Sequence, residues 1–357
     1  RTVEIARSCG VTVFEREWED SLSVARNQAI DQASGAWICI LDADESLSLT
    51  SGEALLSAVL NAPSTVQGLR LRVGSSLGDR YHAAGRTAVR VFRNKHTFTF
   101  KLRIHTQLWP VPTEIADCDA TIVKSGRVLT EAEQRDRYEG ELLLLNLDLR
   151  ENPGDPWILF NLGKTANQIG DHDAAIGYLT QAIQASTQSD PHLREAFVLK
   201  GASIIERLGH SNAILIFEEG LRHVGWDANL YFSLGKCFTA LGNTQRAIDS
   251  FEMLLDGRYK SESSNFGLSF AWHEALYNLG ILYLQANQYG RAKSILNDAL
   301  NSAPTFTPSA FMLFDAALER EDYGTARRML HHVGAVEGNT ANYQKMRERL
   351  EGFLNGA

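Results

Sequence analysis

Hydrophobic and polar positions follow two different patterns, and the change comes near residue 130. Before it, short amphipathic helices alternate with strands whose side chains switch faces at every residue. The apolar run over residues 36–41 stops abruptly at the acidic residues 42–45. A run that is apolar on both sides predicts a central, parallel strand buried between helices. Helices are expected over residues 2–9, 21–32 and 51–60, and strands over residues 11–14, 66–73, 86–93 and 97–105.

Alternation within these strands separates apolar from basic side chains. Leu69 and Leu71 are expected on one face of their strand. Arg70 and Arg72 then point the other way, and His105 falls on the basic face of the last strand. We therefore predict an α/β N-terminal region with a mixed sheet.

From about residue 131 the strand signals disappear and the pattern becomes helical and repetitive. A small residue recurs where the two helices of each pair cross, and its spacing resembles the period of the tetratricopeptide repeat, about 34 residues. We expect about five repeats over residues 153–340, a terminal helix over 341–354 and a Ser- and Gly-rich insertion near 257–269. The recurring small residues are Ala175, Ala213, Ala247, Ala292 and Ala326.

Charge is unevenly distributed over the 357 residues, whose formal net charge is −8. The acidic excess lies beyond residue 130, which argues against a nucleic-acid protein, because phosphate backbones select basic surfaces. Between residues 70 and 103, however, basic residues greatly outnumber acidic ones. Such a local surplus attracts a polyanion such as a diphosphate. The alternative is the solvated outer face of a sheet, and the sequence favours the two equally.

Composition and cysteine spacing narrow the class of protein. Hydrophobic residues make up 44% and charged residues 22% of the chain, a globular balance that excludes a mostly disordered or fibrous protein. The four cysteines form no CxxC pair, which argues against a zinc ribbon and for a reducing compartment, the cytoplasm. No apolar run reaches the length of a transmembrane segment. The chain opens with Arg1 inside an amphipathic pattern, so we expect an N-terminal piece to be missing.

Two carboxylates, Asp42 and Asp44, directly follow the apolar run, with Glu45 next to them. In open α/β sheets ligands bind beyond the carboxyl ends of strands. A divalent cation would relieve the repulsion between these acids. The alternative is a loop carboxylate that caps the next helix, a role open to Glu45. His105, at the end of another strand, could complete a metal site with Asp44, or could be an ordinary surface histidine.

Ordered blocks along the chain resemble one enzyme family. Residues 14–27 and 33–45 are similar to family 2 glycosyltransferases of the GT-A fold. They are most similar to the bacterial branch that carries tetratricopeptide repeats behind the catalytic domain. Residues 89–94 and 104–108 resemble later blocks of that branch, and residues 151–157 resemble its junction with the repeats.

The resemblance implies transfer of a sugar, with inversion, from a nucleotide-diphosphate donor with the help of Mn²⁺ or Mg²⁺. By motif position, Asp44 would bind the metal, Asp42 the metal or the donor ribose, and His105 would lie beside the metal. A cation with nearby arginines stabilises the charge that develops on a leaving diphosphate. The residues expected to bind the donor are Asp42, Arg26, Asn27, Arg90 and Arg93, with Arg103 as a further arginine. The expected metal ligands are Asp42, Asp44 and His105.

The chain departs from the family pattern at three places. Relatives begin with a strand, a loop that holds the nucleotide base and an acidic turn, all of which would precede Arg1. Thr106 stands where relatives usually carry Glu, and residues 122–127 lack the histidine and the aromatic residue often found there. An inverting displacement also needs a base for the acceptor proton. No catalytic residue is assigned, and Glu45 and Glu114 are the candidates.

The predicted organisation is a family 2-like GT-A domain over residues 1–130 without its first strand, a linker helix over 131–152, and tetratricopeptide repeats over 153–357. The predicted function is metal-dependent transfer of a sugar to a protein or glycan acceptor, which the repeats bind in their groove. The alternative is a repeat scaffold for protein interactions whose transferase-like half is incomplete or inactive. Phosphate sensing or nucleic-acid binding through the basic stretch is the least favoured reading.

Overall fold

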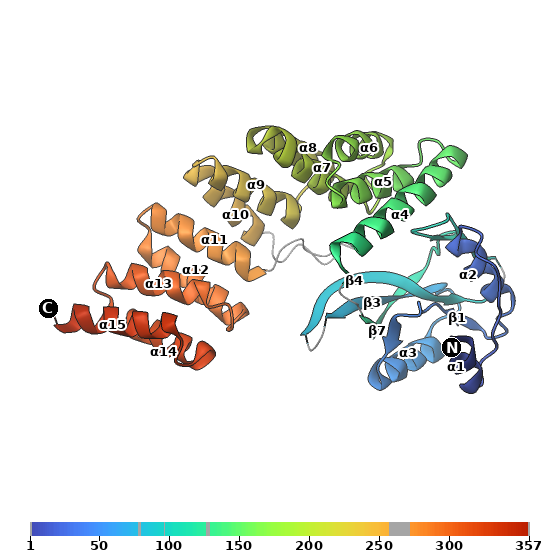
Figure 1. Cartoon of the computed structure of the whole chain (residues 1–357), viewed down its shortest axis with the longest axis horizontal. Coiled ribbons are helices and arrows are strands. Elements are labelled where there is room, and N and C mark those ends of the chain that lie inside the picture. Colours follow the sequence, from blue (N-terminus) through green and yellow to red (C-terminus); the bar gives the residue numbers. More distant parts are fainter. Residues whose placement is uncertain (1, 78–79, 96, 126–128, 257–271, 356–357) are drawn as a thin grey trace. The chain divides into compact units, whose positions relative to one another are not determined.

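The computed structural model describes residues 2–77, 80–95, 97–125, 129–256 and 272–355. These residues form two compact units, one ending at Leu199 and the other beginning at Lys200 (Figure 1). The predicted order, an α/β region with a mixed sheet followed by an all-helical solenoid, is confirmed. The predicted insertion near 257–269 lies outside the described residues. None of the described helices has both the length and the apolar character needed to cross a bilayer.

The first unit begins with the α/β region. Its helices are α1 (Thr2–Ser8), α2 (Leu22–Asp31) and α3 (Leu49–Asn61). The strands of its main sheet are β1 (Trp37–Cys39), β2 (Glu45–Leu47), β3 (Gly68–Leu77), β4 (Arg80–Arg93) and β7 (Ile115–Ser125). A second, two-stranded sheet contains β5 (Thr99–Lys101) and β6 (Gln107–Trp109). The Ser21 and Ser48 side chains accept hydrogen bonds from backbone amides in the first turns of α2 and α3, which explains where these helices start.

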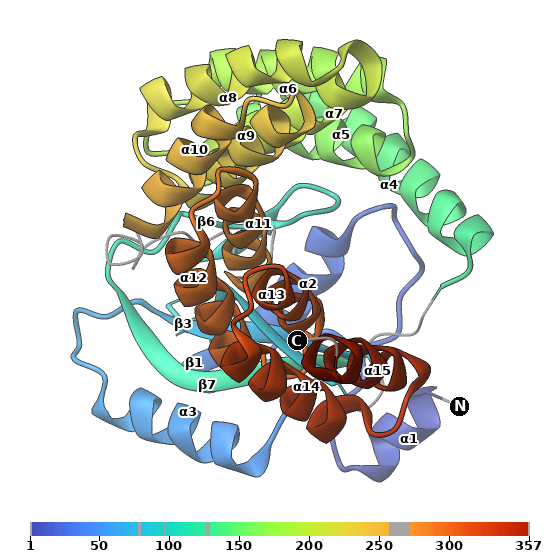
Figure 2. The same cartoon turned by 90° about the vertical axis from the view of Figure 1, so that its left-hand side faces the viewer.

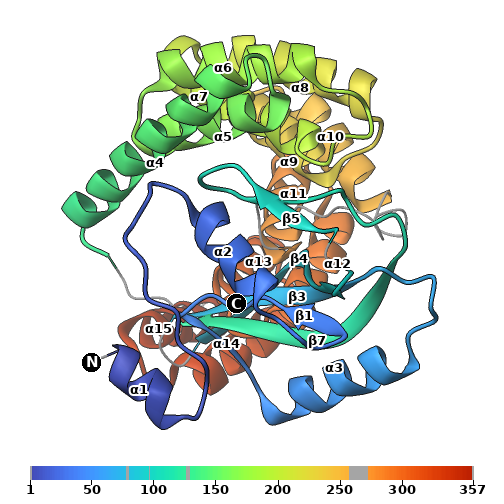
Figure 3. The same cartoon turned by 90° about the vertical axis from the view of Figure 1, so that its right-hand side faces the viewer.

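The main sheet is mixed and carries a helix on each face. Its strand order is β1-β4-β3-β7-β2, in which β3 and β7 are parallel and the other pairs are antiparallel. Helix α3 packs on Leu69, Leu71 and Ile122, whereas α2 packs through Ile30 on Phe92. The two helices lie on opposite sides of the sheet (Figures 2 and 3). Leu69 and Leu71 share one face of their strand, as predicted, and both are buried.

Three strand predictions were wrong. The apolar run does not form a central parallel strand, because β1 lies at an edge of the described sheet and pairs antiparallel with β4. Residues 11–14 form no strand in the part of the sheet that the structure describes. The strand expected over 97–105 ends at Lys101, because Leu102 and His105 have left-handed backbone φ of 71° and 49°.

Arg70 and Arg72, at the start of the basic stretch between residues 70 and 103, pair with acids of β7 on the face of the sheet opposite α3. Parallel pairing of β3 with β7 places Arg70 opposite Asp117, and their side chains form an ion pair of 3.0 Å. Arg72 forms an ion pair with Asp119, although a register shift between Arg70 and Arg72 places Thr121 opposite it in the strand pairing. This part of the stretch is therefore the solvated sheet face that the sequence left as an alternative.

The helical repeats are paired helices. Before them, α4 (Glu131–Glu151) starts with a capping box between Thr130 and Glu133. The pairs are α5 (Pro156–Gln168) with α6 (His172–Ala185), α7 (Leu193–Leu208) with α8 (His210–Val224), α9 (Ala228–Ala240) with α10 (Thr244–Asp256), α11 (Trp272–Gln285) with α12 (Tyr289–Ser302), and α13 (Pro308–Leu318) with α14 (Tyr323–Glu337). Helix α15 (Ala341–Asn355) follows them.

Close approach of the paired helices explains the recurring small residues. All five predicted alanines of the second helices are fully buried. Each of four first helices carries a glycine that faces a large side chain of the second helix. A Cβ at Gly163 would lie 2.5 Å from Leu179, and one at Gly235 would lie 2.7 Å from Phe251. These distances leave no room for a methyl group, so glycine is required at these crossings.

Replacing Asp322 by Ala is expected to lower the free energy of unfolding by about 1 kcal/mol at pH 7, because Asp322 caps α14. Its carboxylate accepts hydrogen bonds from Lys293 Nζ (2.7 Å) and from the backbone N–H and hydroxyl of Thr325. The bond from Lys293, more than any other contact, holds the pKa of Asp322 well below its usual range. A depressed native pKa stabilises the fold above the unfolded pKa and loses that effect as pH falls through the native value.

The difference between the wild type and Asp322→Ala should therefore shrink below about pH 4. Urea denaturation from about pH 7 to pH 3 measures it, with the exposed Asp298→Ala as the control. A difference that stays constant across this range would contradict the assigned role of the Lys293 contact.

Candidate active site

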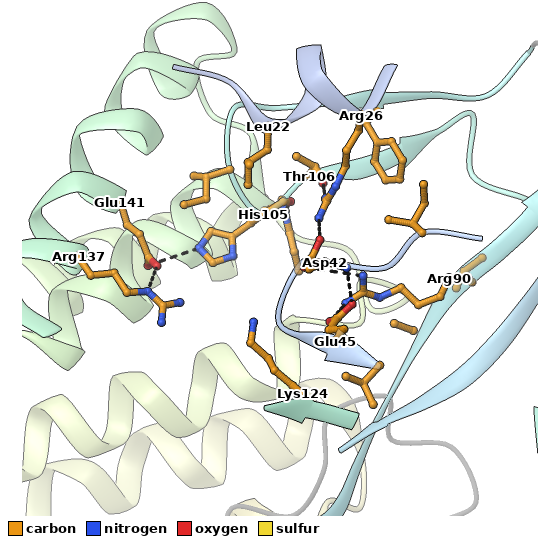
Figure 4. Close-up of a pocket in the computed structure, with 17 residues that line it drawn as sticks. Leu22, Arg26, Asp42, Glu45, Arg90, His105, Thr106, Lys124, Arg137 and Glu141 are labelled. Atoms are coloured by element: carbon orange, nitrogen blue, oxygen red, sulfur yellow. Dashed lines mark hydrogen bonds and ion pairs between the residues drawn. The ribbon is translucent and has the colours of Figure 1, made fainter. Parts of the chain in front are cut away.

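A pocket of about 480 Å³ lies beyond the end of β1 in the first unit (Figure 4). Its walls come from α2, the loop after β1, β4, the loop after β5, and helices α4 and α5. Its polar and charged lining residues are Arg26, Asp42, Glu45, Arg90, His105, Thr106, Lys124, Arg137 and Glu141. The structure thus brings together four predicted site residues from distant parts of the sequence, which are Arg26, Asp42, Arg90 and His105.

Asp42 is held by Arg26 at the pocket wall. Arg26 Nη2 lies 2.6 Å from Asp42 Oδ1, and Arg26 also donates to the Thr106 hydroxyl. The guanidinium carbon lies 5.3 Å from the centroid of the Phe100 ring, which supports it from below. The Asp42 side chain is about one-third exposed, and its second oxygen, Oδ2, lies 3.9 Å from Arg90 Nη1.

Glu45 lies at the base of the same loop and is almost completely buried. Its carboxylate forms a 2.7 Å ion pair with Arg90 and accepts a 2.9 Å hydrogen bond from the backbone N–H of Asp42. Ser48, rather than Glu45, caps the following helix. Glu45 therefore shapes the loop that presents Asp42, and its buried oxygens are already engaged as acceptors.

The backbone of His105 is fixed by contacts to α4 and α5. Trp157 Nε1 donates a 3.0 Å hydrogen bond to the His105 carbonyl. Arg103 forms ion pairs of 2.8 Å with Asp148 and 2.6 Å with Glu151. Because the loop has left-handed residues on both sides of Arg103, these contacts are needed to hold a backbone that would otherwise relax.

The His105 ring faces a buried carboxylate on α4. Glu141 Oε2 lies 3.8 Å from His105 Nε2, and Glu141 Oε1 accepts a 3.1 Å hydrogen bond from Arg137 (Figure 4). Burial opposes ionisation of Glu141, but the facing imidazole and the Arg137 guanidinium outweigh it and lower the pKa of this carboxyl group.

Other predicted residues point elsewhere. Asn27 exchanges two hydrogen bonds with the backbone of Phe100, so it holds β5 against α2. Arg93 donates to backbone carbonyls at the end of α3 and stacks on Trp37. Neither residue lines the pocket, and the same is true of Arg103 and Glu114.

Asp44 also stands apart from the pocket lining. Its carboxylate lies 3.1 Å from Lys124 Nζ and is nearly half exposed. Its carbonyl accepts hydrogen bonds from the Ser125 backbone and hydroxyl, which tie the loop to the end of β7. A role for Asp44 in binding a cation stays a prediction, and it requires the side chain to leave Lys124.

The described side chains around the pocket supply too few metal ligands to hold a cation unless a substrate supplies the others. Among the described residues, no group of three His, Cys, Asp or Glu side chains converges as metal ligands. Asp42 and His105 line the same pocket. The carboxylate oxygens of Asp42 suit Mn²⁺ or Mg²⁺, whereas the imidazole nitrogen of His105 suits a transition metal such as Mn²⁺ better than Mg²⁺. Mg²⁺ at nucleotide sites usually takes one or two carboxylates plus phosphate oxygens rather than a complete protein cage. The residues present therefore suit a cation that arrives with a diphosphate.

Family models match both regions of the chain. Residues 1–125 match the family model of glycosyl transferase family 2. Residues 158–188 and 273–306 match one model of the tetratricopeptide repeat, and residues 230–263 match another. The chain thus joins a region that matches family 2 glycosyltransferases to tetratricopeptide repeats. The resemblance inferred from the sequence is thereby confirmed, and α4 and α5 follow the matched transferase region.

The individual proteins that this chain resembles share less than 30% of its sequence. A TPR repeat-containing protein of Synechococcus elongatus is 28% identical over 233 residues, which are 60% of this chain and 55% of the relative. The chain therefore spans about half the length of this curated relative. The C-terminal part of a TPR repeat-containing protein of Cytophaga hutchinsonii is 17% identical, with a TM-score of 0.48 over 60% of this chain and 80% of that one. A tetratricopeptide repeat protein of Parabacteroides merdae is 16% identical, with a TM-score of 0.44 over 56% and 73%.

Sequence reasoning missed the contribution of α4 to the pocket. Arg137 and Glu141 were not singled out, although both line it. Glu141 lies on the buried face of α4 together with Leu145, one turn later. An acidic residue on the buried face of a helix is rare unless it has a partner, and this signal could have identified Glu141.

Proposed function

We propose that the chain is a metal-dependent, inverting glycosyltransferase that uses a nucleotide-diphosphate sugar. One observation carries the proposal: Asp42, Arg26, Arg90 and His105 converge on one pocket at the tip of β1, within the region that matches family 2. The alternative, a repeat scaffold with an inactive transferase-like half, has no observation that favours it over the enzyme.

Two arginines supply the charge that a departing diphosphate requires. Arg26 and Arg90 enter the pocket from α2 and β4, and each already holds a carboxylate at 2.6–2.7 Å. A guanidinium has five N–H donors, so each arginine can bind phosphate oxygens of the donor while it keeps its carboxylate partner. A divalent cation bound with the donor would add stabilisation of the charge on the leaving group.

We further propose that a protein or glycan acceptor binds in the groove of the repeats and that the reaction takes place in the cytoplasm. Repeat solenoids present extended concave surfaces to such partners. The location is proposed from the dispersed cysteines, which are typical of proteins from reducing compartments.

Release of nucleoside diphosphate from a panel of nucleotide sugars tests the proposal. We expect hydrolysis of at least one donor with Mn²⁺ or Mg²⁺, and a fall of about 10²-fold or more when EDTA removes the cation, because the leaving charge loses several kcal/mol of stabilisation. Circular dichroism at the same EDTA concentration checks that the fold is intact. A folded chain that releases no diphosphate from any donor with either cation would favour the scaffold instead.

A further inference from the structure

We propose that Glu141 of α4 is a positioning residue of this pocket: it keeps the proton of the His105 imidazole on Nε2 and so leaves Nδ1 free to serve the donor and its cation. Helix α4 follows the matched residues 1–125, so the chain completes its transferase site with a residue from outside the family region. The inference rests on the proposed function of the pocket.

One ring nitrogen of His105 lacks a hydrogen-bond partner within the described part of the chain, and a carboxylate faces it. His105 Nε2 is shielded from solvent and makes no hydrogen bond to any residue the structure describes. The group that faces this nitrogen is the Glu141 carboxylate, 3.8 Å away. A movement of less than about 1 Å would bring the two atoms to hydrogen-bond distance. A buried N–H of an imidazole needs such a partner.

Both members of the pair are held in place from outside the pair. Arg137 engages Glu141 Oε1 at 3.1 Å, so the other oxygen, Oε2, is the one turned toward the ring. The Glu141 side chain is only 9% exposed, whereas that of Arg137 is 60% exposed, so the arginine brings a solvated charge to a buried carboxylate. Trp157 holds the His105 carbonyl from α5. The relative orientation of carboxylate and ring is therefore set by α4 and α5 together.

Hydrogen-bond chemistry then decides which ring nitrogen is free. A neutral imidazole has one donor and one acceptor nitrogen, and an ionised carboxylate can only accept. The nitrogen that faces Glu141 must therefore carry the proton, and Nδ1 keeps the lone pair. Histidines that bind metals usually donate their other N–H to a carboxylate or carbonyl, and losing that partner weakens metal binding about 10- to 100-fold.

Mn²⁺ binding in the presence of a nucleoside diphosphate gives the first test. The full chain is titrated with Mn²⁺ by electron paramagnetic resonance with UDP, GDP or dTDP, and the wild type is compared with Glu141→Gln. We expect Glu141→Gln to weaken the diphosphate-dependent site about 10- to 100-fold. The matched control is Glu139→Gln, the same change at an exposed residue of α4 paired with Arg135, which should leave the affinity unchanged. Equal affinity in the wild type and Glu141→Gln would overturn the inference.

A second measurement needs neither cation nor donor. Nitrogen-15 NMR of histidine-labelled protein at about pH 8, where an ordinary imidazole is neutral, reports which nitrogen carries the proton. Loss of one signal in His105→Gln identifies the resonances of this ring. We expect the proton on Nε2 in the wild type and in Glu139→Gln, and a weaker preference for Nε2 in Glu141→Gln. A proton on Nδ1 in the wild type, or an unchanged ring in Glu141→Gln, would overturn the inference.

The two measurements separate this inference from the proposed function. A wild-type chain that binds no Mn²⁺ with any diphosphate argues against the metal-dependent transferase, while the NMR result still decides the role of Glu141. Conversely, a wild type with a clear diphosphate-dependent site that Glu141→Gln leaves intact supports the enzyme and removes Glu141 from its machinery.

Discussion

Replacing Asp42 by Asn should reduce nucleotide-sugar hydrolysis about 10²- to 10³-fold, equivalent to about 2.7–4 kcal/mol of lost transition-state stabilisation. Asp42 is the pocket-lining carboxylate at the tip of β1, and its Oδ1 anchors Arg26 at 2.6 Å. An amide keeps the size of the side chain but removes the negative charge that would bind the donor or its cation. It also replaces the ion pair with Arg26 by a neutral hydrogen bond, so the variant perturbs both groups that we expect to contact the diphosphate.

Two further variants show whether a loss of activity is specific to Asp42. Asp31→Asn changes an exposed acid at the end of α2, outside the pocket, and should retain the wild-type rate. Asp44→Asn tests the second acid of the motif, whose carboxylate lies beside Lys124 rather than in the pocket. Wild-type activity in a folded Asp42→Asn protein would refute the assignment of this pocket as the donor site. A loss in Asp42→Asn without one in Asp44→Asn would restrict the role to Asp42.

Local patterning was sufficient to predict the helices and the repeat but not the position of β1 in the sheet. The buried alanines of the repeat are set by contacts within one helix pair, so their spacing is visible in the sequence. The apolar run at residues 36–41 indicates that the strand is covered, and Ile38 is indeed buried under α2. The run carries no information about which strands are the hydrogen-bond partners of β1. Because burial and strand pairing are separate properties, an edge strand covered by a helix resembles a central one.

The site was predicted in part for a similar reason. Asp42 and His105 were found because they follow strand-like runs, and the structure brings both to one pocket. An arginine, by contrast, gives no sign in the sequence of what its guanidinium contacts. Arg90 reaches the pocket, whereas Arg93, three residues later, binds backbone carbonyls and stacks on Trp37. Glu141 meets His105 only through tertiary folding, which no local pattern records.

Replacing Phe217 by Ala is expected to lower the free energy of unfolding of the repeats by about 3–5 kcal/mol, since truncating a buried aromatic ring leaves a cavity. Phe217 is 1% exposed and fills the crossing of α7 and α8 against Gly201. For a unit of this size the loss corresponds to a fall in Tm of about 6–20 °C. Thermal unfolding followed by circular dichroism measures it. Leu215→Ala, two residues away on α8 and 62% exposed, should stay within about 0.5 kcal/mol of the wild type.

The same crossing allows a stricter check of the cause. A Cβ at Gly201 would overlap the Phe217 ring, so Gly201→Ala alone should destabilise the repeats by about 1–3 kcal/mol. In the Phe217→Ala background the ring is gone and the new methyl group enters the cavity, so the second change should have little effect or partly restore stability. Residues in contact show such non-additive effects, whereas independent sites add. Strict additivity of the two changes would mean that Gly201 and Phe217 do not pack against each other, and the explanation of the repeat glycines by helix crossing would fail.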